Sequence, residues 1–509
     1  MTARAWSVAL VGMNGTPVEV EAAIGGGLPK VVLVGLPDAS LGEARDRCKA
    51  AVTSSKLPWP SQLVTINLSP AMLPKAGSHY DLAIVAAVLA AAETVRSAVL
   101  DRMVFWGELS LDGRVRAVRG ILPGLLAARR VGLTTAVVPA AQLAEAQLVE
   151  GLTIWPVATL IDVIEVLHGR PSLAVVPEAE PKVERRPEQA LDLADVAGQP
   201  DGRWALEVAA AGRHHLYFHG PPGVGKTLLA ARLPTILPEL QTCESVEVSA
   251  VHSLCGLSLR DGLIRRPPLA APHHSASVAA LVGGGPRIAM PGSVSLAHRG
   301  VLFLDEAPEF DRRALEALRL PLEEGEVRIA RSVASITYPA RFQLVLAANP
   351  CPCGNAGTPG AECRCSPHSI RRYGERLSGP ILDRVDLHQQ LRPLRRAFLA
   401  DALRAAEPSA AVADRVQAAR ERQARRLEGT PWATNGEVPG GYLRRELSSP
   451  EADKVLSDAT ARGLSARGVD KVLRLAWTLA DLGARQRPQG QDFRVALAMR
   501  RGETLMAAS

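Results

Sequence analysis

The sequence predicts an α/β protein built of more than one domain, and three observations lead to this prediction. The chain has 509 residues, which is more than one hydrophobic core normally organises. Short β-rich runs alternate with Ala- and Leu-rich stretches of helical character up to about residue 390. From about residue 392 the pattern turns helical. We therefore expect two α/β units followed by a helical unit.

The expected boundaries follow changes in composition along the chain. Strands of the first unit are expected at Val31–Leu36, Leu63–Leu68 and Ala136–Pro139. The segment after this unit holds prolines and mixed charges without a period, which is typical of a linker. The division that we expect is 1–167 for the first unit, 168–189 for the linker, 190–392 for the second unit and 393–509 for the helical region.

The composition narrows the class of protein. Hydrophobic residues make up 47% and charged residues 22% of the chain, an ordinary globular balance, and the net charge of +7 permits a polyanionic partner. The longest apolar run, Leu82–Ala92, is about half the ~20 residues that cross a bilayer, so no membrane partner is expected. Asn14-Gly15 predicts a hairpin turn, which argues against a signal peptide. Seven cysteines, four of them within Cys351–Cys365, argue against a disulfide scaffold and favour the cytoplasm.

A phosphate-binding loop is predicted in the second unit. The pattern G-x-x-x-x-G-K-[ST] follows an expected strand, His214–His219, and precedes an expected helix. Its residues are Gly220, Pro221, Pro222, Gly223, Val224, Gly225, Lys226 and Thr227. Glycines in such a loop turn backbone N–H groups toward one anion, the lysine reaches the β- and γ-phosphates, and the hydroxyl binds Mg²⁺. The pattern thus predicts an ATP and Mg²⁺ site, against the alternative of a glycine turn without a ligand.

Two further strand ends supply polar groups to the same site. The apolar run Val301–Leu304 ends at Asp305 and Glu306, which suit a Mg²⁺ ligand and a general base that polarises the attacking water. The run Leu344–Ala348 ends at Asn349, which is placed to orient that water. Strands often end in acids at solvent, and Asn349 alone could be a turn residue. The preceding P-loop favours the catalytic interpretation.

These segments, together with Ala347–Gly354 and Ser378–Leu387, resemble the YifB/ComM family, which is related to the ATPase subunit of magnesium chelatase and more distantly to the MCM helicases. The resemblance covers essentially the whole chain. It implies an AAA+ P-loop ATPase core with a C-terminal helical lid domain, and a ring, expected to be a hexamer, in which one subunit completes its neighbour's site. By this resemblance Arg384 is the arginine finger and Arg474 the second sensor. Without the family, Arg384 beside Asp383 would be an ordinary surface pair.

The resemblance also suggests which segment of the protein would contact nucleic acid. The segment Gly325–Thr337 is expected to form two strands around a short turn, and in related ring helicases such a hairpin enters the pore and touches the nucleic-acid backbone. Arg328 and Arg331 would be its cations. An ordinary solvated hairpin is the alternative, and the arginine-rich segment Arg392–Arg426 competes as a DNA-binding surface.

A cysteine cluster lies between these motifs. Cys351, Cys353, Cys363 and Cys365 sit on one short loop, and four thiolates suit tetrahedral zinc. The C-x-C spacing is tighter than the common C-x-x-C, and His368 could replace one ligand. Reduced free thiols and a redox role stay open as alternatives.

The first unit resembles the Lon-type peptidase domain at Asn67–Gly77 and Gly107–Val115. The position of that family's nucleophilic serine falls on His79 and that of its lysine on Leu122, while Ser78 is one residue out of register. Without a Ser–Lys pair the serine is not activated. We therefore expect a Lon-protease-like domain that does not cleave peptides and serves as an interaction or ring-building module.

The leading functional hypothesis is an ATP-driven ring motor on DNA, a helicase or branch-migration translocase in recombination and natural transformation, as the family resemblance implies. DNA binding would be sequence-independent, to single-stranded or branched DNA. One rival is a chelatase-type ATPase that remodels a protein partner, and another is a DNA-binding scaffold without activity. DNA-stimulated ATP hydrolysis is expected only for the first.

Overall fold

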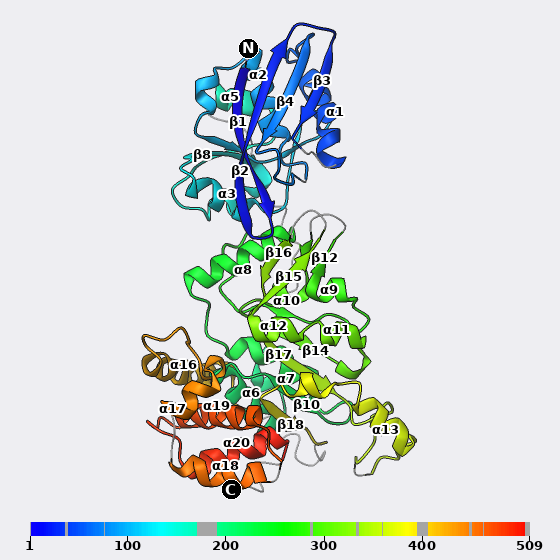
Figure 1. Cartoon of the computed structure of the whole chain (residues 1–509), viewed down its shortest axis with the longest axis vertical. Coiled ribbons are helices and arrows are strands. Elements are labelled where there is room, and N and C mark those ends of the chain that lie inside the picture. The colour runs from blue at the N-terminus through cyan, green and yellow to red at the C-terminus, as the bar shows by residue number, and fades with distance from the viewer. Residues whose placement is uncertain are drawn as a thin grey trace.

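The computed structural model describes residues 2–35, 39–75, 77–170, 191–285, 289–331, 335–358, 360–393, 406–446, 450–461 and 463–503. The molecule is elongated, with the N-terminal unit at one end of the long axis and the C-terminal helices at the other (Figure 1). The predicted linker lies outside the described residues between 171 and 190.

The N-terminal unit is built on a seven-stranded mixed sheet with the order β3-β4-β2-β1-β5-β8-β9. Its strands are β1 (Thr2–Val11), β2 (Asn14–Gly25), β3 (Lys30–Val34), β4 (Leu63–Ser69), β5 (Met103–Phe105), β8 (Thr135–Pro139) and β9 (Thr153–Val157). A small hairpin, β6 (Glu108–Leu109) and β7 (Val115–Arg116), stands apart from this sheet. The helices are α1 (Ala39–Ser54), α2 (Asp81–Ala91), α3 (Ile121–Arg130), α4 (Leu143–Ala146) and α5 (Leu160–Leu167), with single turns of 3₁₀-helix at Ser97–Leu100 and Ala140–Gln142. Every residue of α2 is buried, which explains the longest apolar run of the sequence as a core helix.

The first hairpin turns earlier than the sequence predicts. Val11 pairs with Asn14, so the turn is Gly12-Met13, and Gly12 has a φ of 65°. The prediction of a turn at Asn14-Gly15 was therefore wrong, because both residues belong to β2. Gly15 is needed for another reason: a Cβ at this position would lie 2.3 Å from the Cβ of Ala127 on α3.

The second unit contains a five-stranded parallel sheet with the order β11-β14-β17-β10-β18. Its strands are β10 (Leu216–His219), β11 (Leu269–Ala270), β14 (Val301–Leu304), β17 (Gln343–Ala348) and β18 (Leu387–Gln390). All residues of β14 and β17 are buried, as expected for central strands covered on both faces, and this explains why both appear as unbroken apolar runs.

Helices and two small hairpins surround this sheet. The helices are α6 (Pro200–Gly212), α7 (Lys226–Arg232), α8 (Thr242–Leu254), α9 (Val278–Val282), α10 (Ser293–Leu296), α11 (Arg312–Glu316), α12 (Arg319–Glu324), α13 (Pro367–Gly374) and α14 (Gly379–Leu382). Turns of 3₁₀-helix lie at Leu193–Asp195, Leu233–Ile236 and Ala307–Glu309. The hairpins are β12 (Gly283–Gly284) with β13 (Met290–Pro291), and β15 (Glu326–Ala330) with β16 (Ser335–Pro339).

The C-terminal region is helical. Its helices are α16 (Ser409–Arg426), α17 (Gly440–Arg445), α18 (Pro450–Ala461), α19 (Ala466–Leu482) and α20 (Gly490–Arg501), with a 3₁₀ turn at Asn435–Glu437. Phe218 of the sheet, Leu475 of α19 and Phe493 of α20 belong to one hydrophobic cluster, so these helices share a core with the sheet. No helix among the described residues is long and apolar enough to cross a membrane.

The N-terminal unit rests on the second unit at two places (Figure 1). The backbone N–H of Gly120 donates to the carbonyl of Ser253 at the end of α8 (3.0 Å), and the hydroxyl of Ser253 donates to buried Glu145 (2.5 Å). At the tip of the first hairpin, Gly12 lies against Ile336 of β16. The two units are therefore in direct contact.

Candidate active site

The parallel sheet brings three predicted motifs to one edge. His219 at the end of β10 pairs with Ala348 at the end of β17, and Leu304 at the end of β14 pairs with Leu346. The P-loop, Asp305 and Asn349 each follow one of these ends, so their side chains meet at the carboxyl edge of the sheet. Ligands bind at this edge in open α/β sheets.

The P-loop wraps an open space. Gly223 and Gly225 have φ values of 77° and 94°, where residues with a Cβ are strained, and a Cβ on either glycine would meet nothing within 4 Å. The loop ends where α7 begins at Lys226, so backbone N–H groups and the positive end of the helix face the same space.

Lys226 lies at the centre of the site. Its ammonium donates to the carbonyls of Gly220 (2.7 Å) and Pro221 (2.8 Å) and to Oδ1 of Asn349 (2.9 Å). Burial lowers the pKa of Lys226, while the carboxylates of Asp305 and Glu306 act in the opposite direction. These three acceptors hold the ammonium of Lys226 beside the open space of the loop, where a bound phosphate would replace them as its partner.

The two carboxylates point in different directions. The hydroxyl of Thr227 donates to Oδ2 of Asp305 (2.7 Å), which places the two expected Mg²⁺ ligands together. Glu306 is exposed and has a φ of 49°, an uncommon conformation for a residue with a side chain. The carboxylate of Glu306 lies 3.5 Å from Nδ1 of His274.

Sequence reasoning missed His274 as a neighbour of Glu306. The signal was present, because His274 follows shortly after β11, and β11 pairs with β14, the strand that leads to Glu306. Only the strand order makes this proximity visible.

These residues fit a magnesium-bound nucleoside triphosphate. The open glycine loop at the start of a helix suits the phosphates, and the Thr227 hydroxyl beside the Asp305 carboxylate offers the oxygen ligands that Mg²⁺ prefers.

Arg384 and Arg474 lie elsewhere, at the opposite edge of the sheet. Arg384 precedes β18, whose first residue pairs with Leu216 at the start of β10, so one strand length of about 13 Å separates this edge from the P-loop edge. Both arginines line a cleft of about 700 Å³. Arg384 forms an ion pair with Glu323 and donates to the carbonyl of Pro380 (2.8 Å), while Nε of Arg474 donates to the carbonyl of Val438 (2.8 Å).

Comparisons with known proteins relate all three parts of the chain to the same family, the ChlI subunit of magnesium chelatase. Family models match residues 20–142 (subunit ChlI of Mg-chelatase), 192–399 (magnesium chelatase, subunit ChlI) and 406–500 (magnesium chelatase, subunit ChlI C-terminal). An uncharacterized protein of Mycobacterium tuberculosis is 53% identical over 500 residues, 98% of either chain. Competence protein ComM of Haemophilus influenzae is 40% identical over 485 residues, 94% of either chain. The protein YifB of Escherichia coli is 42% identical over 477 residues, 93% of this chain and 92% of that protein. The chain belongs to the YifB/ComM family.

Membership of the YifB/ComM family places the site in an AAA+ ATPase core of the magnesium-chelatase type, which implies the use of ATP and Mg²⁺. The mixed α/β architecture with a parallel core sheet, a Lon-like N-terminal region and a C-terminal domain is likewise that of the family.

The expected hairpin is present in this YifB/ComM family member as β15 and β16. Val327, Ile329, Ile336 and Tyr338 are buried on one face, and the opposite face is exposed. The two arginines of this hairpin already have partners: Arg328 forms ion pairs with Glu326 (2.5 Å) and Glu324 (3.5 Å), and Nε of Arg331 donates to the carbonyl of Gly285 (2.9 Å). A phosphate would have to compete with these groups.

The competing arginine-rich segment is described only at residues 392–393 and 406–426. Within α16, Arg415 pairs with Glu207 and Glu407, Arg420 donates to the carbonyl of Ala210, and Arg426 pairs with buried Asp481. Arg415 and Arg420 join α16 to α6 of the ATPase unit, and Arg426 joins α16 to α19 within the helical region. These three arginines therefore already have structural partners.

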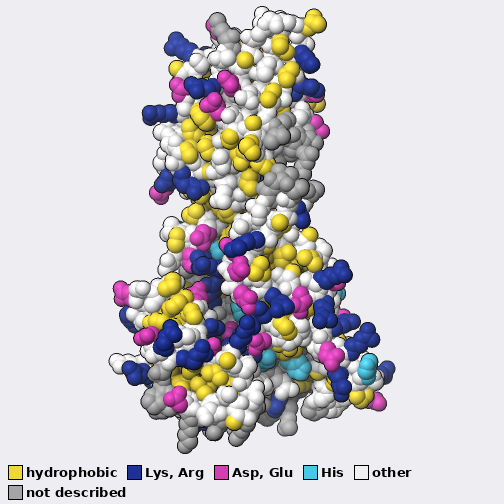
Figure 2. All heavy atoms as spheres, in the orientation of Figure 1, with side chains coloured by type: hydrophobic (Ala, Val, Ile, Leu, Met, Phe, Trp, Pro, Cys, Tyr) yellow, Lys and Arg dark blue, Asp and Glu magenta, His cyan; other side chains and the backbone are white. Residues whose placement is uncertain are grey.

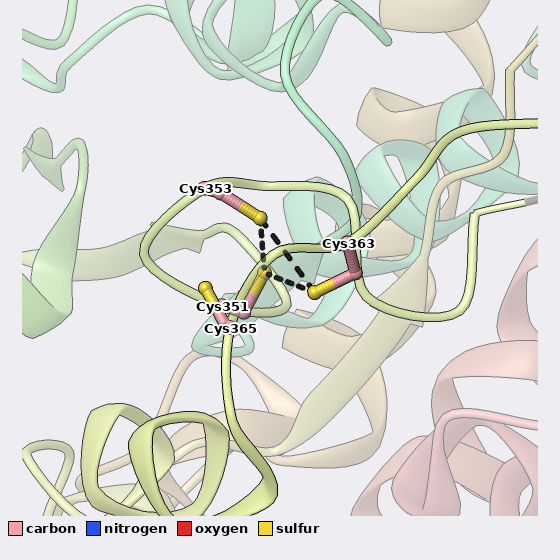
Figure 3. A group of neighbouring side chains, drawn as sticks. All are labelled: Cys351, Cys353, Cys363 and Cys365. Carbon is pink, nitrogen blue, oxygen red and sulfur yellow. Dashed lines mark hydrogen bonds between the residues drawn. The ribbon is translucent and has the colours of Figure 1, made fainter.

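The four cysteines of the cluster lie together. Their sulfur atoms are all within 4.8 Å of one another, and Figure 3 shows the side chains turned toward a common centre. His368 is not a member of this group. Backbone hydrogen bonds from Asn355 and Arg364 lower the pKa of Cys353 to about 6, while the pKa of the neighbouring Cys363 is raised to about 11. The group fits a small thiophilic cation.

The expected positions of the Lon-type nucleophile and base hold no reactive pair. His79 is buried, stacks on Trp106 (centroids 4.3 Å apart) and bonds to the carbonyl of Val8 (2.9 Å), and Leu122 is buried in the core. Ser78 forms a hydrogen bond with the carboxylate of Glu108. Within the described residues the structure gives Ser78 no lysine partner.

Proposed function

We propose that this protein is an ATP-driven ring motor that acts on DNA. The observation that supports this proposal best is the meeting of Lys226 with Asn349 and of Thr227 with Asp305 at one edge of a parallel sheet. This arrangement provides a cation for the phosphates, two oxygen ligands for Mg²⁺ and a polar group beside the transferred phosphoryl group.

In the proposed reaction Glu306 polarises the attacking water, and Asn349 orients it. Thr227 and Asp305 would hold Mg²⁺, which would neutralise charge on the phosphates. The carboxylate of Glu306 lies beside His274, while Asp305 accepts from the Thr227 hydroxyl and, through Oδ1, from the N–H of Glu306 (2.9 Å). The two carboxylates can therefore serve different roles.

We further propose that Arg384 and Arg474 act on the nucleotide of a neighbouring subunit. Both line a cleft at the sheet edge opposite the P-loop of their own chain, so they are too far away to serve that site. A closed ring, which we propose to be a hexamer, brings this cleft to the next P-loop. The arginines would then stabilise charge on the transferred phosphoryl group.

DNA is the proposed substrate of the motor. The name of the relative ComM refers to competence, and that relative covers nearly the whole chain. Figure 2 shows many Lys and Arg side chains over the middle and lower parts of the molecule, mixed with acidic ones, and fewer over the N-terminal unit. We propose helicase or branch-migration activity in recombination and natural transformation, with Arg328 and Arg331 of the β15–β16 hairpin as contacts to DNA phosphates.

Four further assignments are part of the proposal. The four clustered cysteines bind one Zn²⁺, the chain divides at 167, 189 and 392, and the protein works in the cytoplasm. The Lon-like unit serves as an interaction module, because Ser78 is bonded to Glu108 and not to the lysine that a Ser–Lys pair requires.

A chelatase-type motor that remodels a protein partner is the second candidate, supported by the magnesium-chelatase family models over all three parts. One experiment separates the two candidates. ATP hydrolysis by the purified protein is measured without nucleic acid, with single-stranded DNA and with a branched junction. A stimulation of at least about fivefold by DNA is expected for the DNA motor. A rate of ATP hydrolysis that is unchanged by either DNA favours the chelatase-type motor. The absence of any ATP hydrolysis contradicts both candidates.

A further inference from the structure

The cysteine group lies directly against the phosphate-binding loop. Cys351 follows Asn349 after one intervening residue and is fully buried. Gly354, at the end of the turn that contains Cys353, packs on Pro222 in the P-loop: a Cβ at Gly354 would lie 2.5 Å from Cδ of Pro222. Gly354 has a φ of 80°, and its N–H donates to the carbonyl of Cys351 (2.9 Å). A shift of the cysteine loop would therefore shift the P-loop.

We propose that a zinc ion bound by the four cysteines clamps the loop 351–354 onto Pro222, so that metal occupancy sets the affinity of the P-loop for nucleotide. This inference rests on the proposed nucleotide site and adds a form of regulation to it.

The sulfur positions favour a single tetrahedral ion. Zinc–sulfur bonds of about 2.3 Å in a tetrahedron place the sulfurs about 3.8 Å apart. The Sγ atoms of Cys351, Cys353 and Cys363 are separated by 3.3, 3.6 and 3.8 Å, and the dashed lines of Figure 3 mark these pairs. A [4Fe–4S] cluster would hold its cysteines farther apart, because each cysteine sulfur binds a different iron.

The other end of the cysteine loop is also tied to the site. After Cys365, the side chain of Ser366 caps α13, and the buried Tyr373 of this helix lies close to the backbone of Asn349. The cysteine loop thus starts beside Asn349 and returns to it. Asn349 in turn accepts a hydrogen bond from Lys226 (2.9 Å), so the cysteine loop meets the nucleotide site at this contact as well as at Pro222.

Two glycines of the same loop provide a matched test. Gly354 and Gly357 have similar positive φ values, 80° and 68°, but a Cβ at Gly357 would meet nothing within 4 Å. Alanine therefore introduces comparable backbone strain at both positions, and only Gly354→Ala pushes on Pro222. Neither substitution removes a cysteine. Zinc content and the affinity for a fluorescent ATP analogue are measured for both variants and for the unchanged protein.

All three proteins are expected to hold about one zinc per chain. Gly354→Ala should bind the ATP analogue about tenfold or more weakly, because a displaced loop misplaces the groups that receive the phosphates, whereas Gly357→Ala should match the unchanged protein. Equal affinities for the two variants would overturn the clamp. Iron, or no metal, in the unchanged protein would overturn the zinc site.

Removal of the metal provides a second readout. Zinc is released with a mercurial reagent and a chelator from a Cys243→Ser background, because Cys243 is exposed and would also react. The affinity for the ATP analogue should fall by a similar factor and return when thiol and Zn²⁺ are restored. An unchanged affinity after complete zinc loss would also overturn the clamp. If the unchanged protein binds no nucleotide, the proposed function itself fails, which is a different result.

Discussion

The ammonium of Lys226 donates a 2.9 Å hydrogen bond to Oδ1 of Asn349 and so connects the P-loop to the end of the neighbouring strand. The two residues are 123 positions apart in the chain. We expect different effects from substituting the two residues. Lys226 is proposed to bind the phosphates through its positive charge, whereas Asn349 is proposed to orient the attacking water.

Lys226→Ala should weaken ATP binding by about a hundredfold or more, since the phosphates lose a charge held in a partly buried site. Asn349→Ala should leave the affinity within about threefold and reduce kcat by roughly ten- to a hundredfold. Titration with a fluorescent ATP analogue and steady-state hydrolysis measure the two effects. If Asn349→Ala loses affinity as severely as Lys226→Ala, Asn349 serves binding rather than turnover.

Glu306→Gln should bind ATP normally and fail to hydrolyse it, because the amide cannot accept a proton from water. A loss of kcat of at least about a hundredfold is expected. Glu309→Gln is a suitable control, as Glu309 pairs with Arg376 on the surface and should leave hydrolysis unchanged. Normal turnover by Glu306→Gln would remove this residue from the proposed role.

Arg384→Ala should retain nucleotide affinity and lose hydrolysis by about a thousandfold, if the guanidinium acts across a subunit interface. Mixing these subunits with Lys226→Ala subunits should restore part of the activity, since mixed interfaces contain one intact site. Subunit exchange is confirmed separately with labelled protein. Absence of rescue despite exchange would contradict action in trans.

Buried His214 and half-buried His215, just before β10, predict that the ATPase and helical units lose stability in mild acid. Burial lowers the pKa of His214 and of His215 to about 4, and Nδ1 of His215 accepts the N–H of Leu344 (3.0 Å), which requires an unprotonated nitrogen. In the unfolded chain both return to about 6.5. Between these pH values the unfolded chain binds protons that the folded one does not, so the stability of the folded state falls as the pH falls.

The expected loss is about 3 kcal/mol for each histidine over this range. Asp386 does not contribute there: burial alone would raise its pKa, but Lys471 and the histidines keep it well below the usual value, so its effect appears only in stronger acid. Urea unfolding at a series of pH values measures the slope, and His215→Gln should reduce it by about one proton. A stability independent of pH between 7 and 4 would show that these imidazoles are accessible to protons in the folded state.

Arg328→Ala/Arg331→Ala should leave ATP hydrolysis without DNA in place while DNA stimulation and strand movement fall. The slope of log affinity against log salt should decrease by roughly one to two. Because Arg328 is paired with Glu326, the decrease should lie near the lower value. The matched control is Arg312→Ala/Arg313→Ala, which removes two exposed arginines of α11 outside the hairpin. Equal behaviour of the two double variants would make the β15–β16 hairpin a structural element.

Much of the candidate site could be predicted because its signals are local. An apolar run followed by a glycine loop, by Asp305-Glu306 or by Asn349 indicates a buried strand and the polar group at its end, and parallel strands necessarily place these ends at one edge. The turn of the first hairpin was misplaced for the opposite reason. Asn14-Gly15 has a favourable turn composition, but Gly15 is required by its packing against α3, which no local pattern contains.

The sequence by itself determined which residues form the proposed nucleotide site, since Lys226, Thr227, Asp305 and Asn349 are each identified by the strand or helix beside them. The tertiary structure alone decided which distant groups meet: His274 with Glu306, Gly354 with Pro222, and Arg384 with Arg474 at the edge opposite the P-loop. Periodicity in a sequence reports which face of an element is buried. It does not report how the loops run between elements, and the course of the loops decides which residues far apart in the chain come into contact.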